Sequence, residues 1–148
     1  MFTGVLLALA TLVWEKPLQD KPLPTLKLIA QADRPGGYWC EVTNPSKTSW
    51  YFRGYSPASF QSKLPADRIA PYSQIQRLKN GQWVTDFDGR CGVGIGPVEL
   101  PAETKASFFT FLRDSERDEV RVGITISPTK DWKHSQNIWS EPVKGSKQ

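Results

Sequence analysis

The chain has little of what most catalytic sites are built from. Its 148 residues include one histidine and two cysteines, Cys40 and Cys91. The histidine, His134, lies in a polar stretch typical of a loop, where histidines are usually solvated. No serine stands in a nucleophile-elbow pattern, and nothing in the sequence places His134 beside either cysteine. We therefore expect no catalytic residues and no enzyme, and a small hydrolase is the least favoured alternative.

The sequence also lacks the motifs that hold metals and cofactors. Asp86 and Asp88 precede Gly89 as in a calcium loop, but the later acidic ligands are missing. The segment GRCGVGIGP, Gly89 to Pro97, is glycine-rich like a phosphate loop, yet Pro101 follows closely and leaves no room for a helix. We expect no metal and no cofactor. We interpret the glycines as residues that allow the backbone to adopt positive φ, to cross between sheets or to pass close to another strand.

Basic residues are not clustered in this chain. There are 19 lysines and arginines against 15 acidic residues, a net charge of +4, and the two signs are mixed. Nucleic-acid binders usually carry a concentrated basic stripe. We therefore predict no nucleic-acid partner.

Long hydrophobic runs are absent as well. The uncharged, mostly apolar run from Gly4 to Trp14 is shorter than the roughly 20 residues that cross a bilayer, so no stable membrane span is expected. It fits the apolar region of a secretory signal, although no Lys or Arg precedes it, and a buried first strand is the alternative. We predict export to the periplasm, cell surface or exterior, with the cytoplasm left open. The chain then divides into a leader (1–14), a linker (15–24), one domain (25–143) and a tail (144–148).

Apolar residues recur at every second position through most of the domain, which is typical of strands. The clearest stretch is Glu119 to Ser127, and Asn80-Gly81 between two alternating runs predicts a hairpin over 73–87. The third strand follows the second closely, as in another hairpin. We predict an all-β fold, a single antiparallel β-sandwich. The expected strands are 25–32, 38–43, 50–55, 73–78, 82–87, 105–112, 119–127 and 138–143.

Cys40 and Cys91 allow two interpretations. A disulfide between them would close a loop of about 50 residues and stabilise the fold by about 4 kcal/mol. Cys40 also lies in a segment that is typical of a buried strand, and free buried cysteine is common.

Aromatic residues are the most suggestive feature, because they make up 11% of the chain and include six tryptophans. Neighbouring side chains alternate across a strand, so some of these rings must lie outside the core. Exposed rings bind sugars or partner proteins, whereas the plainer interpretation is core packing and loop anchoring. The candidate ligand-binding residues are Trp50, Tyr51, Tyr55, Trp83 and Trp132.

Three segments together carry a resemblance. They are Asn80-Gly81-Gln82-Trp83, then Arg90 to Gly94, then Val120 to Ile124 with the closing Trp139 to Val143. Their order resembles a group of uncharacterised bacterial exported β-sandwich domains, and Trp-Ser-x-Pro is similar to the last strand of fibronectin type III domains.

The spacing of Cys40, Trp50 and Cys91 also resembles that of immunoglobulin domains, but too many strand-like runs follow Cys91. The resemblance implies an immunoglobulin- or fibronectin-like sandwich and brings no active-site residues. The function predicted is a non-enzymatic accessory or protein-interaction module at the cell envelope. The alternative is a carbohydrate-binding module, so the expected partner is a protein or a polysaccharide.

Overall fold

The computed structural model describes residues 21–33, 36–56, 64–86, 94–112 and 118–144. These residues form strands and connections and contain no helix, and so no helix in them could cross a membrane. The leader (1–14), most of the linker and the tail beyond Lys144 lie outside the described residues.

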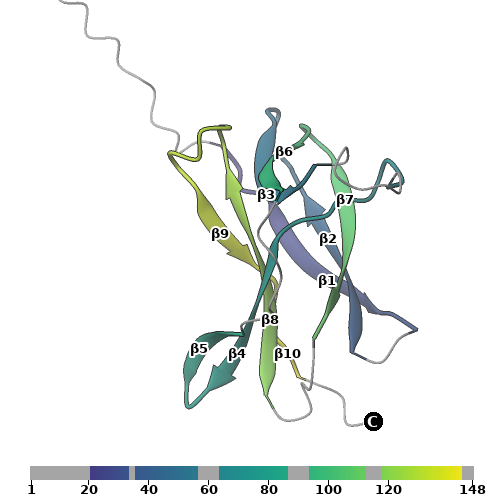
Figure 1. The fold of residues 1–148 in the computed structure, drawn as a ribbon, viewed down its shortest axis with the longest axis vertical. Coiled ribbons are helices and arrows are strands. Elements are labelled where there is room, and N and C mark those ends of the chain that lie inside the picture. The colour runs from purple at the N-terminus through teal and green to yellow at the C-terminus, as the bar shows by residue number, and fades with distance from the viewer. Residues whose placement is uncertain (1–20, 34–35, 57–63, 87–93, 113–117, 145–148) are drawn as a thin grey trace, which may run out of the picture.

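Two antiparallel sheets pack face to face, which confirms the predicted all-β sandwich (Figure 1). The smaller sheet has the order β1-β2-β7, formed by β1 (Thr25–Gln31), β2 (Gly37–Thr43) and β7 (Lys105–Phe111). The larger sheet has the order β5-β4-β8-β3-β6, with β9 and β10 also paired to β8. Its strands are β3 (Trp50–Tyr55), β4 (Ser73–Lys79), β5 (Gln82–Asp86), β6 (Ile95–Leu100), β8 (Glu119–Ser127), β9 (Gln136–Trp139) and β10 (Val143–Lys144).

Strand β8 is the centre of the larger sheet, because β3, β4, β9 and β10 all pair with it. Its alternating sequence turns four apolar side chains toward the smaller sheet, where all are fully buried. These are Val120, Val122, Ile124 and Ile126. Alternate residues of the smaller sheet pack against them in the same core, and these include Leu26, Cys40, Val42 and Phe108. The core therefore follows from period-two patterning in both sheets.

The hairpin over β4 and β5 is confirmed. Asn80 and Gly81 connect the strands with φ of 52° and 78°. Both central residues therefore have the left-handed backbone that a two-residue hairpin turn requires, and Asn-Gly supplies it at little cost.

The glycine-rich segment leads into a strand, β6, with no helix after it. Gly94 has a φ of 83°, one of the backbone uses expected for these glycines, while residues 89–93 lie outside the described residues. The sequence did not predict β6 because Pro97 stands within it. Proline is tolerated there because β6 is an edge strand whose one partner among the described strands is β3.

The expected hairpin between the second and third strands is wrong, since β2 and β3 belong to different sheets. The chain crosses between them over residues 44–49, beside the second crossing from β6 to β7. Asn44 is fully buried there, and its Nδ2 lies 3.0, 3.2 and 2.9 Å from the carbonyl oxygens of Thr48, Leu100 and Pro101. One amide thus satisfies backbone groups of both crossings.

The expected last strand over 138–143 is also different from the structure. It is interrupted after Trp139, and β10 begins only at Val143. The Oγ of Ser140 accepts a hydrogen bond from the Val122 amide at 3.1 Å and donates one to the Glu141 carbonyl at 3.0 Å. This local bonding, together with Pro142, which has no N–H, replaces regular strand pairing.

Candidate functional site

The outer side of the smaller sheet carries a cluster of aromatic rings. In β2, Cys40 points into the core, so Trp39 points out; in β7, Phe108 points in, and Phe109 and Phe111 point out. The register places Trp39 directly opposite Phe109. We call Trp39, Phe109 and Phe111 the aromatic face.

The three rings meet edge to face. The ring centroids of Trp39 and Phe109 are 5.4 Å apart with an interplanar angle of 68°, and those of Phe109 and Phe111 are 4.8 Å apart at 87°. Phe111 is 45% exposed although a buried phenylalanine would contribute far more to stability. The solvent-facing side of a sandwich sheet is usually polar, so this face departs from the pattern of a purely structural surface.

The segment 64–71 runs beside this face and links the two sheets. The amide of Ile69 donates to the Ser107 carbonyl at 3.0 Å, and the amide of Ser107 donates to the Asp67 carbonyl at 2.8 Å. The amide of Tyr55 in the other sheet donates to the Ala70 carbonyl at 2.9 Å. The segment is therefore held by backbone bonds at both ends, which places Arg68 firmly.

A pocket of about 520 Å³ opens between this segment and the aromatic face. The guanidinium of Arg68 lies 3.9 Å from the centre of the Trp39 ring. The other walls of this pocket are mostly apolar. A second hollow of about 340 Å³ lies alongside, and Trp39 and Phe109 line both. The first hollow, which we call the Arg68 pocket, is lined among others by Trp39, Tyr55, Leu64, Arg68, Ile69 and Phe109.

The side chain of Arg68 makes no hydrogen bond or ion pair to another described residue, and its Nε is shielded from solvent without a hydrogen-bond partner. By contrast, Arg77 pairs with Asp86, and Arg121 donates two hydrogen bonds to Gln76 at 3.0 and 2.7 Å. Arg68 thus keeps donor capacity beside an apolar pocket.

The five sequence candidates are not brought together, and no ring contact joins any two of them among the described residues. Trp50 is 3% exposed and lies in the core. Alternate residues of a strand point to the same side, so Trp50 shares the inner side of β3 with the fully buried Phe52. Trp50 is therefore not available to an exposed platform. Of the five, Tyr55 alone lines the Arg68 pocket.

The other candidates lie elsewhere. Tyr51 is half-buried on β3, with the Lys130 Nζ 5.5 Å from its ring centre. Trp83 stacks on Arg121, whose guanidinium carbon is 4.2 Å from that ring and 4.6 Å from Trp139. This stack of Trp83, Arg121 and Trp139, which we call the aromatic ladder, joins β5, β8 and β9 across the outer side of the larger sheet.

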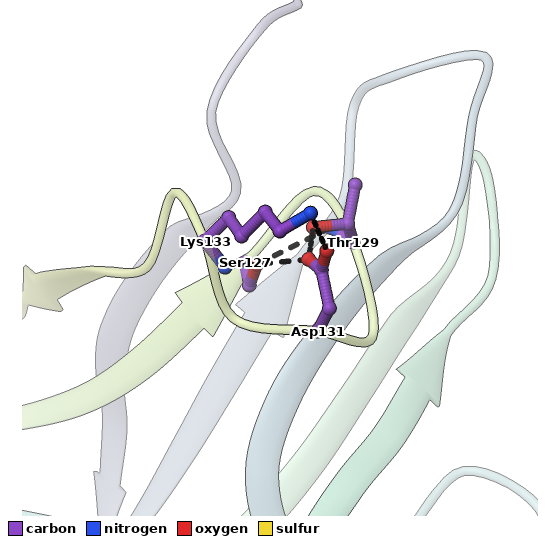
Figure 2. Close-up of polar contacts among 4 residues, drawn as sticks. All are labelled: Ser127, Thr129, Asp131 and Lys133. Atoms are coloured by element: carbon purple, nitrogen blue, oxygen red, sulfur yellow. Dashed lines mark hydrogen bonds and ion pairs between the residues drawn. The ribbon is translucent and has the colours of Figure 1, made fainter.

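Trp132 and His134 belong to the loop between β8 and β9, which an internal polar network shapes (Figure 2). The Oγ1 of Thr129 donates to the Asp131 carboxylate at 2.6 Å, and the Lys133 Nζ lies 3.1 Å from the same carboxylate. Chiefly the Thr129 hydrogen bond, and then those of Lys133, lower the pKa of Asp131 from 3.8 to about 2. Trp132 has a φ of 60° inside this loop.

His134 is exposed and makes no hydrogen bond or ion pair to another described residue. Cys40 is 0% exposed, and burial raises the pKa of its thiol to about 12. Such a thiol stays protonated and is a poor nucleophile at neutral pH. Cys40 is a free thiol in the structure, while Cys91 lies outside the described residues, so a disulfide between them stays a prediction. Within the described ranges, no three His, Cys, Asp or Glu residues form a group that could bind a metal.

Sequence reasoning missed the aromatic face and Arg68. The signal for the face was present, since Trp39 precedes the buried Cys40 and Phe108 and Phe109 are adjacent, so one of each pair must point outward. Nothing in the sequence indicated that the two outward rings would touch. No protein-family model, curated protein or solved structure matches this chain.

Proposed function

We propose that this chain is an exported, non-enzymatic interaction module of the cell envelope, and that the aromatic face is where it contacts a protein partner. The observation that carries the proposal is the mutually packed trio of exposed Phe111 and half-buried Trp39 and Phe109, beside an arginine-containing pocket. Tryptophan, phenylalanine and arginine are enriched where proteins bind one another. Exposed contiguous apolar patches on soluble proteins commonly mark such sites.

The geometry of the rings favours a protein over a polysaccharide. A sugar ring stacks on an aromatic face that is presented flat, and a polysaccharide needs several such faces in one plane. Here the interplanar angles are 68° and 87°, so neighbouring rings do not lie in one plane. Irregular apolar relief of this kind suits interdigitating side chains.

The proposal is tested by selecting, from a displayed library of random peptides, those that bind the purified chain. We expect selected peptides to bind the wild type and to lose about tenfold or more in affinity with Phe111→Ser or Trp39→Ala, because hot-spot aromatics carry most of an interface's energy. Val84→Ser is the matched control, because Val84 is 43% exposed on β5 against 45% for Phe111.

Polysaccharides are tested in parallel by affinity electrophoresis. Retardation by a polysaccharide that Trp39→Ala abolishes, with no peptide selected, would overturn the proposal in favour of carbohydrate binding. Peptides that bind Val84→Ser as weakly as Phe111→Ser would show that the aromatic face is not the contact surface.

Export is tested separately by fusing residues 1–24 to alkaline phosphatase, which is active only outside the bacterial cytoplasm. We expect activity from the fusion and its loss with Leu7→Lys, because a charge in a short apolar run blocks its use as a signal. An inactive wild-type fusion would contradict export and leave the binding proposal to its own test.

A further inference from the structure

Resting on the proposed function, we propose that the Arg68 pocket binds the free C-terminus of the partner protein, with the carboxylate on Arg68 and an apolar last side chain in the pocket. The proposal starts from the size of the cavity. About 520 Å³ lies within the range of sites that enclose small groups and is enough for one large side chain and its terminal carboxylate.

The guanidinium in this pocket is held in place and pairs with no other side chain that the structure describes. The guanidinium carbon lies 3.9 Å from the centre of the Trp39 ring, a contact that uses none of the N–H donors at the edge of the guanidinium. The described residues supply no acceptor to the Arg68 guanidinium, whose shielded Nε is without one. Asp67 is exposed and its carbonyl is engaged by Ser107.

The walls determine what kind of anion fits. Carboxylate and phosphate both match the arginine fork. The neighbouring walls of this pocket are Leu64, Ile69, Phe109 and the Trp39 ring, which cannot solvate the remaining charge of a phosphate. A carboxylate attached directly to an apolar group satisfies both the fork and the walls.

The surroundings favour a peptide over a small carboxylic acid. Trp39 and Phe109 line the Arg68 pocket and also the adjacent hollow of about 340 Å³, whose other walls are Ala32 and Asp33. A chain that ends in the pocket can therefore place an earlier side chain in the second hollow and continue over the aromatic face. Asp33, exposed there, favours a basic or amide side chain at that earlier position.

The experiment titrates matched peptides into the full chain and measures affinity by calorimetry. The first peptide has isoleucine or phenylalanine as its last residue, with a free C-terminal carboxylate. The second has the same sequence but is C-terminally amidated. The third ligand is the last amino acid alone, N-acetylated. We expect amidation to weaken binding about tenfold or more, because a charge-assisted pair is lost, and the single amino acid to bind much more weakly than the peptide.

Variants assign the effect to Arg68. Arg68→Gln should bring the affinity for the free-carboxylate peptide down to that for the amide, and Arg68→Lys should lose part of it, because lysine keeps the charge without the fork. Arg53→Gln, an exposed arginine on β3, is the control and should change nothing. Circular dichroism and unfolding midpoints equal to wild type confirm that the variants fold.

The outcomes separate the two proposals. Equal binding of the amidated peptide, with loss in Trp39→Ala, would overturn the C-terminal site and leave the interaction face standing. Binding of the single amino acid as tightly as the peptide would overturn the peptide assignment in favour of a small-carboxylate pocket. If no peptide with either terminus binds, the interaction module itself fails.

Discussion

The ring of Trp139 on β9 lies directly over Gly123 on β8, so closely that a Cβ at position 123 would collide with ring carbons Cε3 and Cζ3. The two residues are opposite each other in the strand register, next to Arg121, which stacks on the same ring at 4.6 Å. Gly123 is thus the place where the Trp139 ring packs directly onto the central strand β8.

Gly123→Ala should lower the free energy of unfolding by about 1–3 kcal/mol, because the ring must move off the sheet. Urea denaturation measures this. Gly96→Ala is the matched control, because nothing lies within 4 Å of the Cβ it would add, and it should change stability by less than about 1 kcal/mol. In a Trp139→Ala background the cost of Gly123→Ala should largely disappear, and an unchanged cost there would refute the steric explanation.

Asn44→Ala should destabilise the fold by about 2 kcal/mol or more, because the carbonyls of Leu100 and Pro101 lose their donor in a buried site. The measurement is again the free energy of unfolding. Asn137→Ala removes one exposed side-chain hydrogen bond to Thr125 and should cost less than about 0.5 kcal/mol. Equal effects at the two positions would contradict the role of Asn44 in joining the crossings.

The Asp131 network predicts a pH dependence. Because folding lowers the pKa of this carboxyl from 3.8 to about 2, its contribution to stability is present above pH 3.8 and is lost as the pH falls through about 2. The contribution is small, since the residue is exposed. Asp131→Asn should remove this acid dependence from the unfolding midpoint, and a carbon-13 titration of the wild-type carboxyl should have its midpoint near 2. A midpoint near 3.8 would show that the loop is not ordered by this network.

The Cys40 thiol should resist alkylation in the folded chain. Burial raises its pKa to about 12, so at pH 8 less than about 0.1% is thiolate and the sulfur is also shielded. In a Cys91→Ser variant, iodoacetamide should label Cys40 only after denaturant is added. Rapid labelling without denaturant would contradict the buried position of β2.

Thiol counting in denaturant distinguishes the two interpretations of Cys40 and Cys91, a disulfide and free thiols. The wild type, purified without reductant from an oxidising compartment, should show no free thiol if Cys40 and Cys91 are bonded and two if they are not. Two thiols would also weaken the argument that the chain is built for export.

Much of the strand layout was predictable because its causes are local. The alternation in Glu119 to Ser127 and the Asn80-Gly81 turn determine β8 and the β4–β5 hairpin within a few residues. The two strands that were missed or predicted wrongly, β6 and the expected last strand, each contain residues that interrupt the regular pattern. Pro97 concealed an edge strand, and Ser140 and Pro142 broke a run that looked continuous.

The binding candidates were harder, because exposure depends on which side of a strand faces the other sheet. The sequence presents Trp50 and Trp39 as equivalent aromatics, yet Trp50 lies on the inner side of β3 and Trp39 on the outer side of β2. A shift of one residue in the pairing of either strand would turn the tryptophan of that strand to the opposite side of its sheet.

The amino-acid sequence by itself determined that this protein is built of short, half-buried strands, because two-residue periodicity and turn residues act over neighbours. Only the tertiary structure decided that the chain crosses between sheets after β2, that Trp39 meets Phe109, and that Arg68 stacks on Trp39. Those contacts join segments far apart along the chain, and they depend on how the sheets pair and pack as a whole.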